Sequence, residues 1–482
     1  MTKTTRLLAA TCVAVLVAPQ VHATPQLIAI GTLTGSSAGA NADLSGLTGN
    51  LENGVAANFL GGLGSGIAWA GGNTFIAVPD RGPNATPYNG AVDDTSSYIA
   101  RFQTISMNLT PSGGTLPFTL TPTLAGTTLL SSPTPLVYGT GTALGLPSGA
   151  PAANTAGKFY FTGRSDNFDP SQNSGNPNNA RLDPEGVRVA NGGRVVYVSD
   201  EYGPYVYAFD RGTGQRIRSY SLPANLYISN LSPVGATEIA SNTTGRVTNK
   251  GMEGLAITPD GKTLIGMMQA PLAQDTAVGT PNTFLRIVTI DVASGATKEF
   301  GYKLTTGTGV SEIVALNDHE FLVDERDGKG LGAGNNAAVK QVFKIDLAGA
   351  TPLTPGMTAA QLAAAAVGKS LFLDIVGVLN GAPNNIAKGQ IPSKIEGLAI
   401  GDDVVIAGVT THTLWVANDN DFLPLPGDSG PNQFFVFGFT DGDLGGSALI
   451  QQQIPEPAAV GLLGLGLLGL VAVRRAKSSQ PR

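Results

Sequence analysis

The chain has 482 residues, of which 42% are hydrophobic and 13% charged, and its formal net charge is −6. This acidic balance argues against nucleic acid as a partner. The single cysteine, Cys12, excludes an internal disulfide and a metal site built from several cysteines.

The first 23 residues have the three parts of a secretory signal peptide. Lys3 and Arg6 form the positive start, residues 7–18 the apolar core, and Val21-His22-Ala23 a small-residue cleavage pattern. A buried N-terminal helix is the alternative, but the apolar run is short and its flanks are typical of export. Cys12 lies inside this signal, so the exported protein would have no thiol.

After a first predicted strand, Gln26–Leu33, a strand–turn–strand module recurs along the chain. The copy between residues 249 and 275 has two short apolar runs around the turn Pro259-Asp260-Gly261-Lys262. Antiparallel pairing places the start of the first strand beside the end of the second. We therefore expect Glu253 and Gln269 to meet at one end of the hairpin.

Five copies of the module are recognisable, separated by 120, 68, 59 and 84 residues. They start at Gly66, Gly186, Gly254, Ile313 and Gly397. Further strands follow most copies, and four strands per unit is typical of a β-propeller. The longest gap leaves room for a degenerate unit, so we predict an all-β propeller of about six blades, with five or seven as alternatives. The strand Gln26–Leu33 is a candidate to close the ring, and a two-sheet sandwich is the alternative fold.

The C-terminal end has a tripartite tail. Pro455-Glu456-Pro457 precedes an uncharged run over 458–473, which basic residues follow. A helix of that length covers about 24 Å against the ~30 Å hydrocarbon core, so it predicts a marginal transmembrane helix. Its basic end should stay on the cytoplasmic side. The order of parts resembles the PEP-CTERM sorting signal of Gram-negative bacteria, which implies processing by an exosortase, transient contact with the inner membrane, and release or attachment at the cell surface.

Removal of both ends would take six Lys or Arg and one Glu from the 29 basic and 35 acidic residues. The remaining 23 and 34 give a net charge of −11. An exported protein this acidic is suited to binding cations.

Aligned by hairpin, the copies place polar residues at one end of each unit. The first strand opens on Ser65, Glu185, Glu253, Glu312 and Glu396, and the second closes on Asp80, Glu201, Gln269, Glu325 and Asp419. A propeller would gather up to eight carboxylates at one face, and they would raise one another's pKa values unless cations compensate. Ca²⁺ is favoured over Zn²⁺, because the exported chain would have no cysteine and only two histidines.

We predict three groups of site residues. The predicted catalytic residues are Glu253, Glu325, Arg326, Asp80 and Arg81. The predicted metal ligands are Glu185, Glu201, Glu312, Glu396, Asp419 and Asp421, and the predicted substrate-binding residues are Lys250, Arg164 and Lys394. Carboxylates and cations at one mouth suit a phosphorylated or carboxylated substrate, since a metal activates water while Arg stabilises charge. Two structural alternatives stay open: the Glu residues could tie neighbouring blades together, and the Arg residues could form ordinary surface ion pairs.

Seven short motifs follow in a fixed order between residues 60 and 440. They are DRGP (80–83), DPEG (183–186), GMEGLAITPDGKTL (251–264), APLAQD (270–275), DERD (324–327), IEGLA (395–399) and NDNDF (418–422). Together they resemble the bacterial phytase-like proteins described as having esterase-like activity. The resemblance implies a secreted, propeller-type hydrolase of a small anionic ester, with its site at the acidic motif positions. One departure is Gln269, which stands where the family usually has an acid.

We therefore expect a signal peptide at 1–23, a phytase-like propeller domain at 24–453 and a sorting tail at 454–482. The leading hypothesis is a secreted or cell-surface, monomeric, metal-dependent hydrolase of phosphate esters or related esters. The alternative is a non-catalytic propeller, stabilised by Ca²⁺, that binds an extracellular polymer or a partner protein.

Overall fold

The computed structural model describes residues 25–35, 42–276, 278, 283–425 and 427–455. Within them, no helix is long and apolar enough to cross a bilayer. The predicted signal peptide and the apolar run at 458–473 lie outside the described residues.

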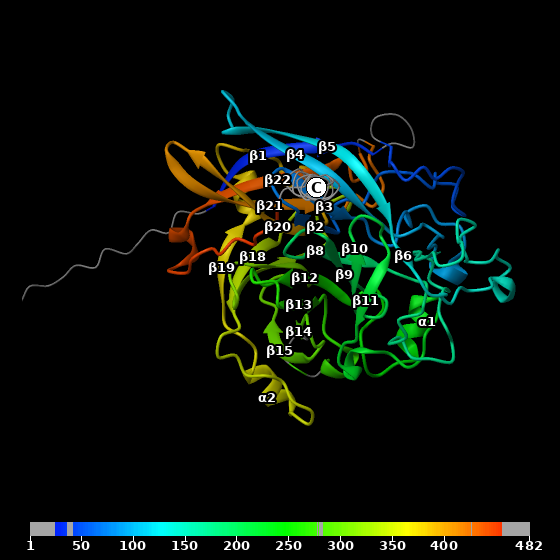
Figure 1. Ribbon diagram of the computed structural model, residues 1–482. Helices are drawn as coiled ribbons and strands as arrows, with labels where there is room; N and C mark the ends of the chain where they lie inside the picture. Colours follow the sequence, from blue (N-terminus) through cyan, green and yellow to red (C-terminus); the bar gives the residue numbers. More distant parts are fainter. Residues whose placement is uncertain (1–24, 36–41, 277, 279–282, 426, 456–482) are drawn as a thin grey trace, which may run out of the picture.

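Five four-stranded antiparallel sheets surround a central axis and form the blades of a propeller (Figure 1). Blade 1 holds β2 (Gly66–Trp69), β3 (Thr74–Val78), β4 (Arg101–Pro111) and β5 (Phe118–Leu129). Blade 2 holds β8 (Pro184–Val189), β9 (Val195–Asp200), β10 (Tyr205–Asp210) and β11 (Arg216–Tyr220). Blade 3 holds β12 (Met252–Ile257), β13 (Thr263–Met268), β14 (Phe284–Asp291) and β15 (Thr297–Lys303). Blade 4 holds β16 (Gly309–Ala315), β17 (Glu320–Arg326), β18 (Lys340–Asp346) and β19 (Lys369–Asp374).

Blade 5 is assembled from both ends of the domain. Its first three strands are β20 (Ile395–Ile406), β21 (Val409–Asn418) and β22 (Asn432–Phe439), and its outer strand is β1 (Gln26–Leu33). β1 pairs antiparallel with β22. The predicted role of this strand in closing the ring is confirmed.

The all-β propeller is confirmed, and the described chain has five blades, which is one of the predicted alternatives to a count of about six. The long gap after the first copy contains an extended β4–β5 hairpin, loops and the two-stranded sheet of β6 (Ser131–Ser132) and β7 (Phe159–Tyr160). The residues of this interval therefore lengthen blade 1 and the loops after it, and they do not form a further blade.

The remaining elements are short and lie between the strands. The α-helices are α1 (Gly235–Ala240), α2 (Ala359–Ala364) and α3 (Ile375–Asn380). The 3-10 helices are η2 (Gly90–Val92), η3 (Thr142–Leu144), η4 (Ala224–Leu226), η5 (Ala273–Asp275), η6 (Lys388–Gln390) and η7 (Asp441–Leu444). α2 lies in an alanine-rich stretch of the sequence.

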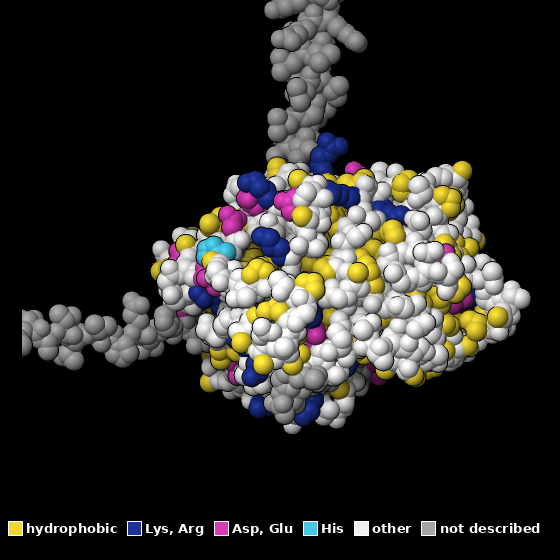
Figure 2. Space-filling model, turned by 90° about the horizontal axis from the view of Figure 1, so that it is seen from below, with side chains coloured by type: hydrophobic (Ala, Val, Ile, Leu, Met, Phe, Trp, Pro, Cys, Tyr) yellow, Lys and Arg dark blue, Asp and Glu magenta, His cyan; other side chains and the backbone are white. Residues whose placement is uncertain are grey.

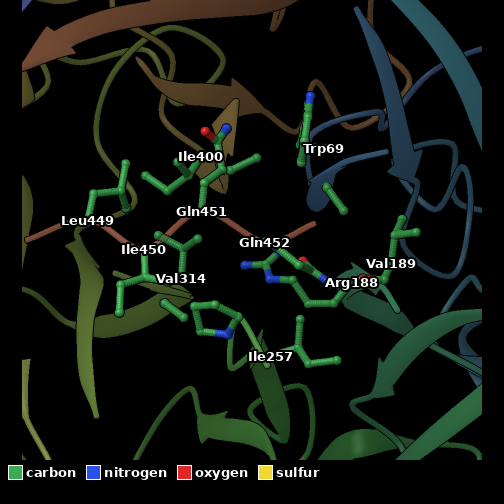
Figure 3. Close-up of a pocket in the computed structure, with 14 residues that line it drawn as sticks. Trp69, Arg188, Val189, Ile257, Val314, Ile400, Leu449, Ile450, Gln451 and Gln452 are labelled. Atoms are coloured by element: carbon green, nitrogen blue, oxygen red, sulfur yellow. Dashed lines mark hydrogen bonds between the residues drawn. The ribbon is translucent and has the colours of Figure 1, made fainter. Parts of the chain in front are cut away.

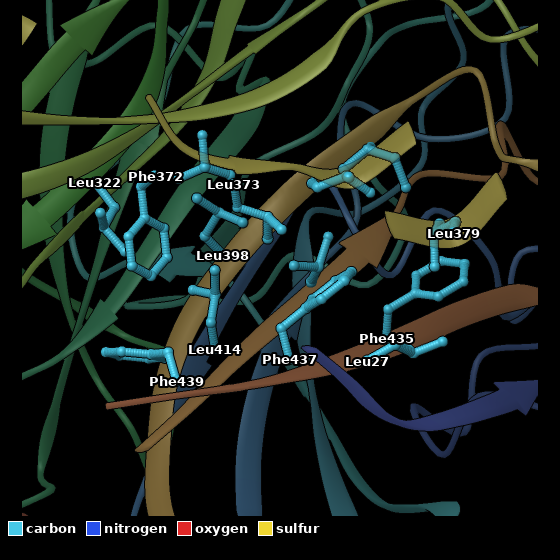
Figure 4. Close-up of a cluster of buried hydrophobic side chains, with 14 of the residues drawn as sticks. Leu27, Leu322, Phe372, Leu373, Leu379, Leu398, Leu414, Phe435, Phe437 and Phe439 are labelled. Carbon is cyan, nitrogen blue, oxygen red and sulfur yellow. The ribbon is translucent and has the colours of Figure 1, made fainter. Parts of the chain in front are cut away.

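Apolar side chains between adjacent blades form the core. In the cluster of Figure 4, Leu322 and Phe372 of blade 4 face Leu398, Leu414 and Phe437 of blade 5. The inner strands β2, β8, β12, β16 and β20 pack against one another in turn, and β20 packs against β2. Charged side chains are sparse on the side of the molecule shown in Figure 2. Many of the acidic residues are instead buried.

Candidate functional site

A polar pocket opens at the end of the propeller where the inner strands begin. Its cavity measures about 70 Å³. Its lining residues are Asp80, Arg81, Glu185, Glu201, Asn249, Glu253, Gln269, Arg326, Lys394, Glu396 and Asp419. We call this cavity the acidic pocket.

Three of the predicted glutamates enter the acidic pocket because a β-bulge interrupts the first hairpin of their blades. In β12, for example, Met252 pairs with Met268 and Gly254 with Met267, so Glu253 is the extra residue. Glu185 and Glu396 occupy the same place in β8 and β20. A bulge re-aims the side chain of the extra residue, here towards the pocket.

The glycine after each of these glutamates allows the inner strands to approach closely. A Cβ placed on Gly186 would lie 2.5 Å from the backbone nitrogen of Leu255 in the next blade. A Cβ on Gly254 would lie 3.0 Å from the backbone nitrogen of Ile313. The Glu-Gly pair thus combines a pocket carboxylate with a close contact between blades.

Blade 4 departs from the predicted alignment by one residue. Val310 pairs with Glu325 and Glu312 with Asp324, so Ser311 is the extra residue of the bulge. Ser311 and Arg326 therefore occupy the positions that the sequence alignment gave to Glu312 and Glu325. Arg326 donates through Nε to Ser311 Oγ at 2.5 Å.

Glu312, a predicted metal ligand, lies on the propeller axis and not in the acidic pocket. Its Oε2 lies 3.1 Å from Nη2 of Arg188. It also accepts hydrogen bonds from the backbone nitrogens of Leu255 and Ile313. Burial raises its pKa to about 7, although Arg188 opposes the shift. Since Arg188 also donates to the carbonyl oxygens of Ile67 and Ile313, this ion pair links blades 1 to 4.

Glu325, a predicted catalytic residue, points away from the pocket on the other face of β17. It accepts a hydrogen bond from Tyr302 at 2.6 Å and pairs with Lys369. Burial would raise its pKa, but these two partners lower it. Two predicted substrate-binding residues also lie elsewhere: Arg164 pairs with Asp166, and Lys250 is exposed outside the lining.

The residue that sequence analysis missed is Asp183. Oxygens of Asp183, Glu185 and Glu201 lie within 4.8 Å of one another, and all three residues are buried. Nη1 of Arg81 lies 2.5 Å from Asp183 and 3.9 Å from Glu201. Asp183 is the first residue of the DPEG motif, so the sequence did point to it. The alignment of the hairpins, however, placed only Glu185 of this motif among the carboxylates at the end of the propeller.

The other side of the acidic pocket carries its own cations. Arg326 pairs with Glu396 and lies 3.8 Å from Glu253. Lys394 lies 2.9 Å from Asp419 and 2.5 Å from Asp421. By contrast, Glu185 has no hydrogen bond or ion pair with the described residues, although it is only 6% exposed.

Burial and crowding shift the acids of the pocket towards their protonated forms. The pKa of Glu185 is raised well above its usual value, first by burial and then by Glu253 and Asp183. Burial and the charge of Glu396 raise the pKa of Glu253 to about 8. Burial likewise raises the pKa of Glu396 to about 7. The pocket therefore favours bound protons or bound cations.

Comparison with known sequences gives two matches within the chain and one relative. Residues 58–422 match the family described as phytase-like, esterase-like activity of phytase. Residues 453–476 match the PEP-CTERM protein-sorting motif, which confirms the predicted tail signal and implies export and exosortase-type sorting in a Gram-negative bacterium. An uncharacterized secreted protein of Arthroderma benhamiae is 30% identical over 309 residues. The alignment spans about half of each protein, 54% of this chain and 54% of that one.

Two solved structures show distant likeness. The hydrazine synthase of Kuenenia stuttgartiensis is 10% identical over 78% of this chain and 79% of its own, with a TM-score of 0.30. The PQQ-bound aldose sugar dehydrogenase of Streptomyces coelicolor is 13% identical over 82% of each chain, also with a TM-score of 0.30. Likeness at this level carries no argument about ligand or activity.

Proposed function

The chain belongs to the phytase-like family described by esterase-like activity of phytase, and on this premise we propose that its acidic pocket hydrolyses phosphate esters or related esters. The observation that carries the proposal is the group formed by Asp183, Glu185 and Glu201. Glu185 is buried there without a partner of its own. An unpaired buried carboxylate is costly, and a bound cation would offset that cost.

We propose that these three residues hold Ca²⁺, because their donor atoms are hard carboxylate oxygens. When bound, the cation would polarise an ester oxygen and lower the pKa of a water molecule. Arg326 and Lys394 line the same pocket and would face an anionic ester. Burial and the charge of Glu396 raise the pKa of Glu253, so this residue would serve as the acid that donates a proton to the leaving oxygen.

The size of the pocket narrows the substrate class. A cavity of about 70 Å³ admits an ion and a single phosphoryl or acyl group, so the rest of the substrate would stay outside the ring. Asp80 and Arg81, also in the lining, would contact that group at its edge. Of the predicted catalytic residues, Glu325 is left out of the proposal because it faces away from the cavity.

The test is turnover by the purified exported protein with Ca²⁺ and then with a chelator. Aryl phosphates and phytate probe phosphate esters, and aryl acetates probe carboxylic esters. Chelator-sensitive turnover of one class is the expected result. If neither class is hydrolysed while Ca²⁺ still raises the melting temperature, the hydrolase proposal fails.

One set of contacts favours a second candidate, a propeller whose acidic pocket is structural. Arg326 of blade 4 pairs with Glu396 of blade 5, and Arg81 from the β3–β4 loop of blade 1 pairs with Asp183 ahead of blade 2. These pairs tie neighbouring blades together, which is a structural role. A non-catalytic propeller that binds an extracellular polymer would need the pocket residues for this role alone. The turnover assay separates the two candidates.

A further inference from the structure

The C-terminal segment crosses the propeller at the end opposite to the acidic pocket. After η7, the backbone nitrogen of Ile450 donates to the carbonyl of Leu316 in blade 4 at 2.8 Å. The side chains of Gln451 and Gln452 donate to the carbonyls of Gly401 in blade 5 and Val189 in blade 2, both at 2.6 Å. We call residues 449–455 the strap (Figure 3).

The strap covers the inner strands at this end of the propeller. The cavity left beneath it measures about 50 Å³. All five blades contribute to its lining: Trp69 from blade 1, Arg188 from blade 2, Ile257 from blade 3, Val314 from blade 4 and Ile400 from blade 5 (Figure 3). Apolar side chains of the inner strands are thus covered by the strap and removed from water.

The end of the strap is part of the folded domain. Ile454 is 7% exposed and packs with the apolar cluster of blades 1 and 2. Pro455 lines a shallow cavity together with Gly193, Arg194 and Arg211. The matched sorting motif begins at residue 453, so its first residues lie against the propeller.

The strap and the acidic pocket lie at opposite ends of the same inner strands. On β8, Glu185 lines the pocket, while Val189 accepts the hydrogen bond from the strap. At about 3.3 Å per residue, four residues separate the two ends by about 13 Å. The Arg188–Glu312 pair lies between them. The described chain ends at Pro455 on the strap face, and 27 further residues follow.

We propose that the strap face is the surface at which the sorting machinery meets this protein, and that the docked strap withholds the start of the motif until its end detaches. The opposite face then keeps the acidic pocket open while the tail is held. This arrangement depends on the sorting motif and on the contacts of the strap. It does not require the pocket to be catalytic.

The first experiment loosens the strap without changing the motif. The double variant Gln451→Ala/Gln452→Ala removes two hydrogen bonds and leaves residues 453–476 intact. We expect the full chain, expressed in a bacterium that has the sorting machinery, to lose its tail several-fold faster in a pulse-chase measurement. Gln274→Ala is the matched control, since this amide also bonds backbone groups but lies in η5, outside the strap. An unchanged rate in the double variant contradicts the withholding role.

The second experiment maps which face is covered, and it does not depend on loosening the strap. The chain has one cysteine, Cys12, inside the predicted signal, so a single introduced cysteine can be labelled. Arg194→Cys lies on the strap face, and Lys250→Cys lies beside the acidic pocket next to Asn249. With a membrane-impermeant maleimide, we expect Arg194→Cys to be protected until the tail is removed and Lys250→Cys to react throughout. Equal labelling of the two, or protection of Lys250→Cys, overturns the proposal.

Discussion

Glu185 is the residue on which the proposed chemistry depends most. Its carboxylate is buried beside Asp183 and Glu201 and has no ion-pair partner of its own. Neighbouring acids such as Glu396 share their charge with an arginine, so a change there disturbs an existing pair. A change at Glu185 should instead act mainly on a bound cation.

We expect Glu185→Gln to abolish the rise in melting temperature caused by Ca²⁺ and to lower turnover at least about 100-fold, because a metal ligand is lost. Without Ca²⁺ the variant should be as stable as the wild type or more so, since the amide carries no charge. Calorimetry with and without Ca²⁺ measures the first effect and a rate assay the second. Glu299→Gln is the control, because Glu299 pairs with Arg286 outside the pocket. A Ca²⁺ response retained in Glu185→Gln would remove this residue from the proposed site.

The buried carboxyl group of Asp324 makes the stability of the folded domain depend on pH. Both of its carboxylate oxygens are buried without a hydrogen bond, and burial raises its pKa to about 8 although Arg326 and Lys340 oppose the shift. Between pH 4 and 8 the folded state therefore holds a proton that the unfolded state has released. The contribution of this bound proton to the free energy of unfolding is complete at low pH and is lost as the pH rises through 8.

We expect Asp324→Asn, which resembles the protonated acid, to be more stable than the wild type at pH 8 to 9. The gain should be of the order of 1–3 kcal/mol, since one pKa unit corresponds to about 1.4 kcal/mol. At pH 4 the two proteins should unfold at similar denaturant concentrations. Denaturant unfolding of both proteins across this range is the measurement. A constant difference at every pH would mean that Asp324 does not titrate as its surroundings suggest.

At the scale of elements, the inner strands combine pocket carboxylates with close packing. The glycine after Glu185, Glu253 and Glu396 is the reason, because it lets the next blade approach. Blade 4 is the exception: Glu312 stands at the glycine position and turns its side chain to Arg188 on the axis.

We expect Gly186→Ala to destabilise the domain by about 1–3 kcal/mol, the usual cost of overpacking. The added Cβ would lie 2.5 Å from the backbone nitrogen of Leu255, and backbone cannot move aside as a side chain can. Gly328→Ala is the control, since nothing lies within 4 Å of a Cβ there. Its effect should be close to zero. The comparison requires only the two midpoints of thermal unfolding, and equal midpoints would contradict the close approach of β8 and β12.

The same elements show what the sequence could reveal. Glu-Gly steps and turns located the hairpins, and pairing rules placed Glu185, Glu253 and Glu396 at one face as found. The error in blade 4 arose because its copy reads Ser311-Glu312 where blades 2, 3 and 5 read Glu-Gly, so alignment by the acid shifted the frame by one residue. A one-residue shift turns a strand side chain to the other face, which explains why Glu325 meets Lys369 and not the pocket.

Some features depended on contacts between distant segments and could not be derived from local patterns. The pairing of β1 with β22 joins residues about 400 positions apart, and repeats only suggest it. The blade count depended on whether the residues between β5 and β8 formed a four-stranded blade or only the short β6–β7 sheet. Their Pro- and Gly-rich composition fits loops as well as a degenerate blade. The place of Asp183 depended on the path of the loop before β8.

At the scale of the whole molecule, one non-covalent seam closes the ring. β1 is the outer strand of blade 5, and the rest of that blade comes from the C-terminal part of the domain. Leu27, Ile28 and Leu33 are buried in the seam. Fully burying one such side chain contributes about 1.5–3 kcal/mol, so the seam contributes several kcal/mol.

We expect an exported chain that lacks residues 24–33 to unfold at least about 3 kcal/mol more easily than the intact chain, because three buried side chains and one ladder of hydrogen bonds are lost. A synthetic peptide with the sequence of residues 25–35, added to the shortened chain, should restore most of the stability, since β1 is held by pairing and packing alone. A peptide of the same composition in scrambled order should not. Chemical unfolding followed by tryptophan fluorescence is a suitable measurement, because Trp415 belongs to β21 of the same blade and Trp69 to β2 of the next. If the shortened chain keeps its stability, or if both peptides rescue it equally, the ring is not closed by this seam.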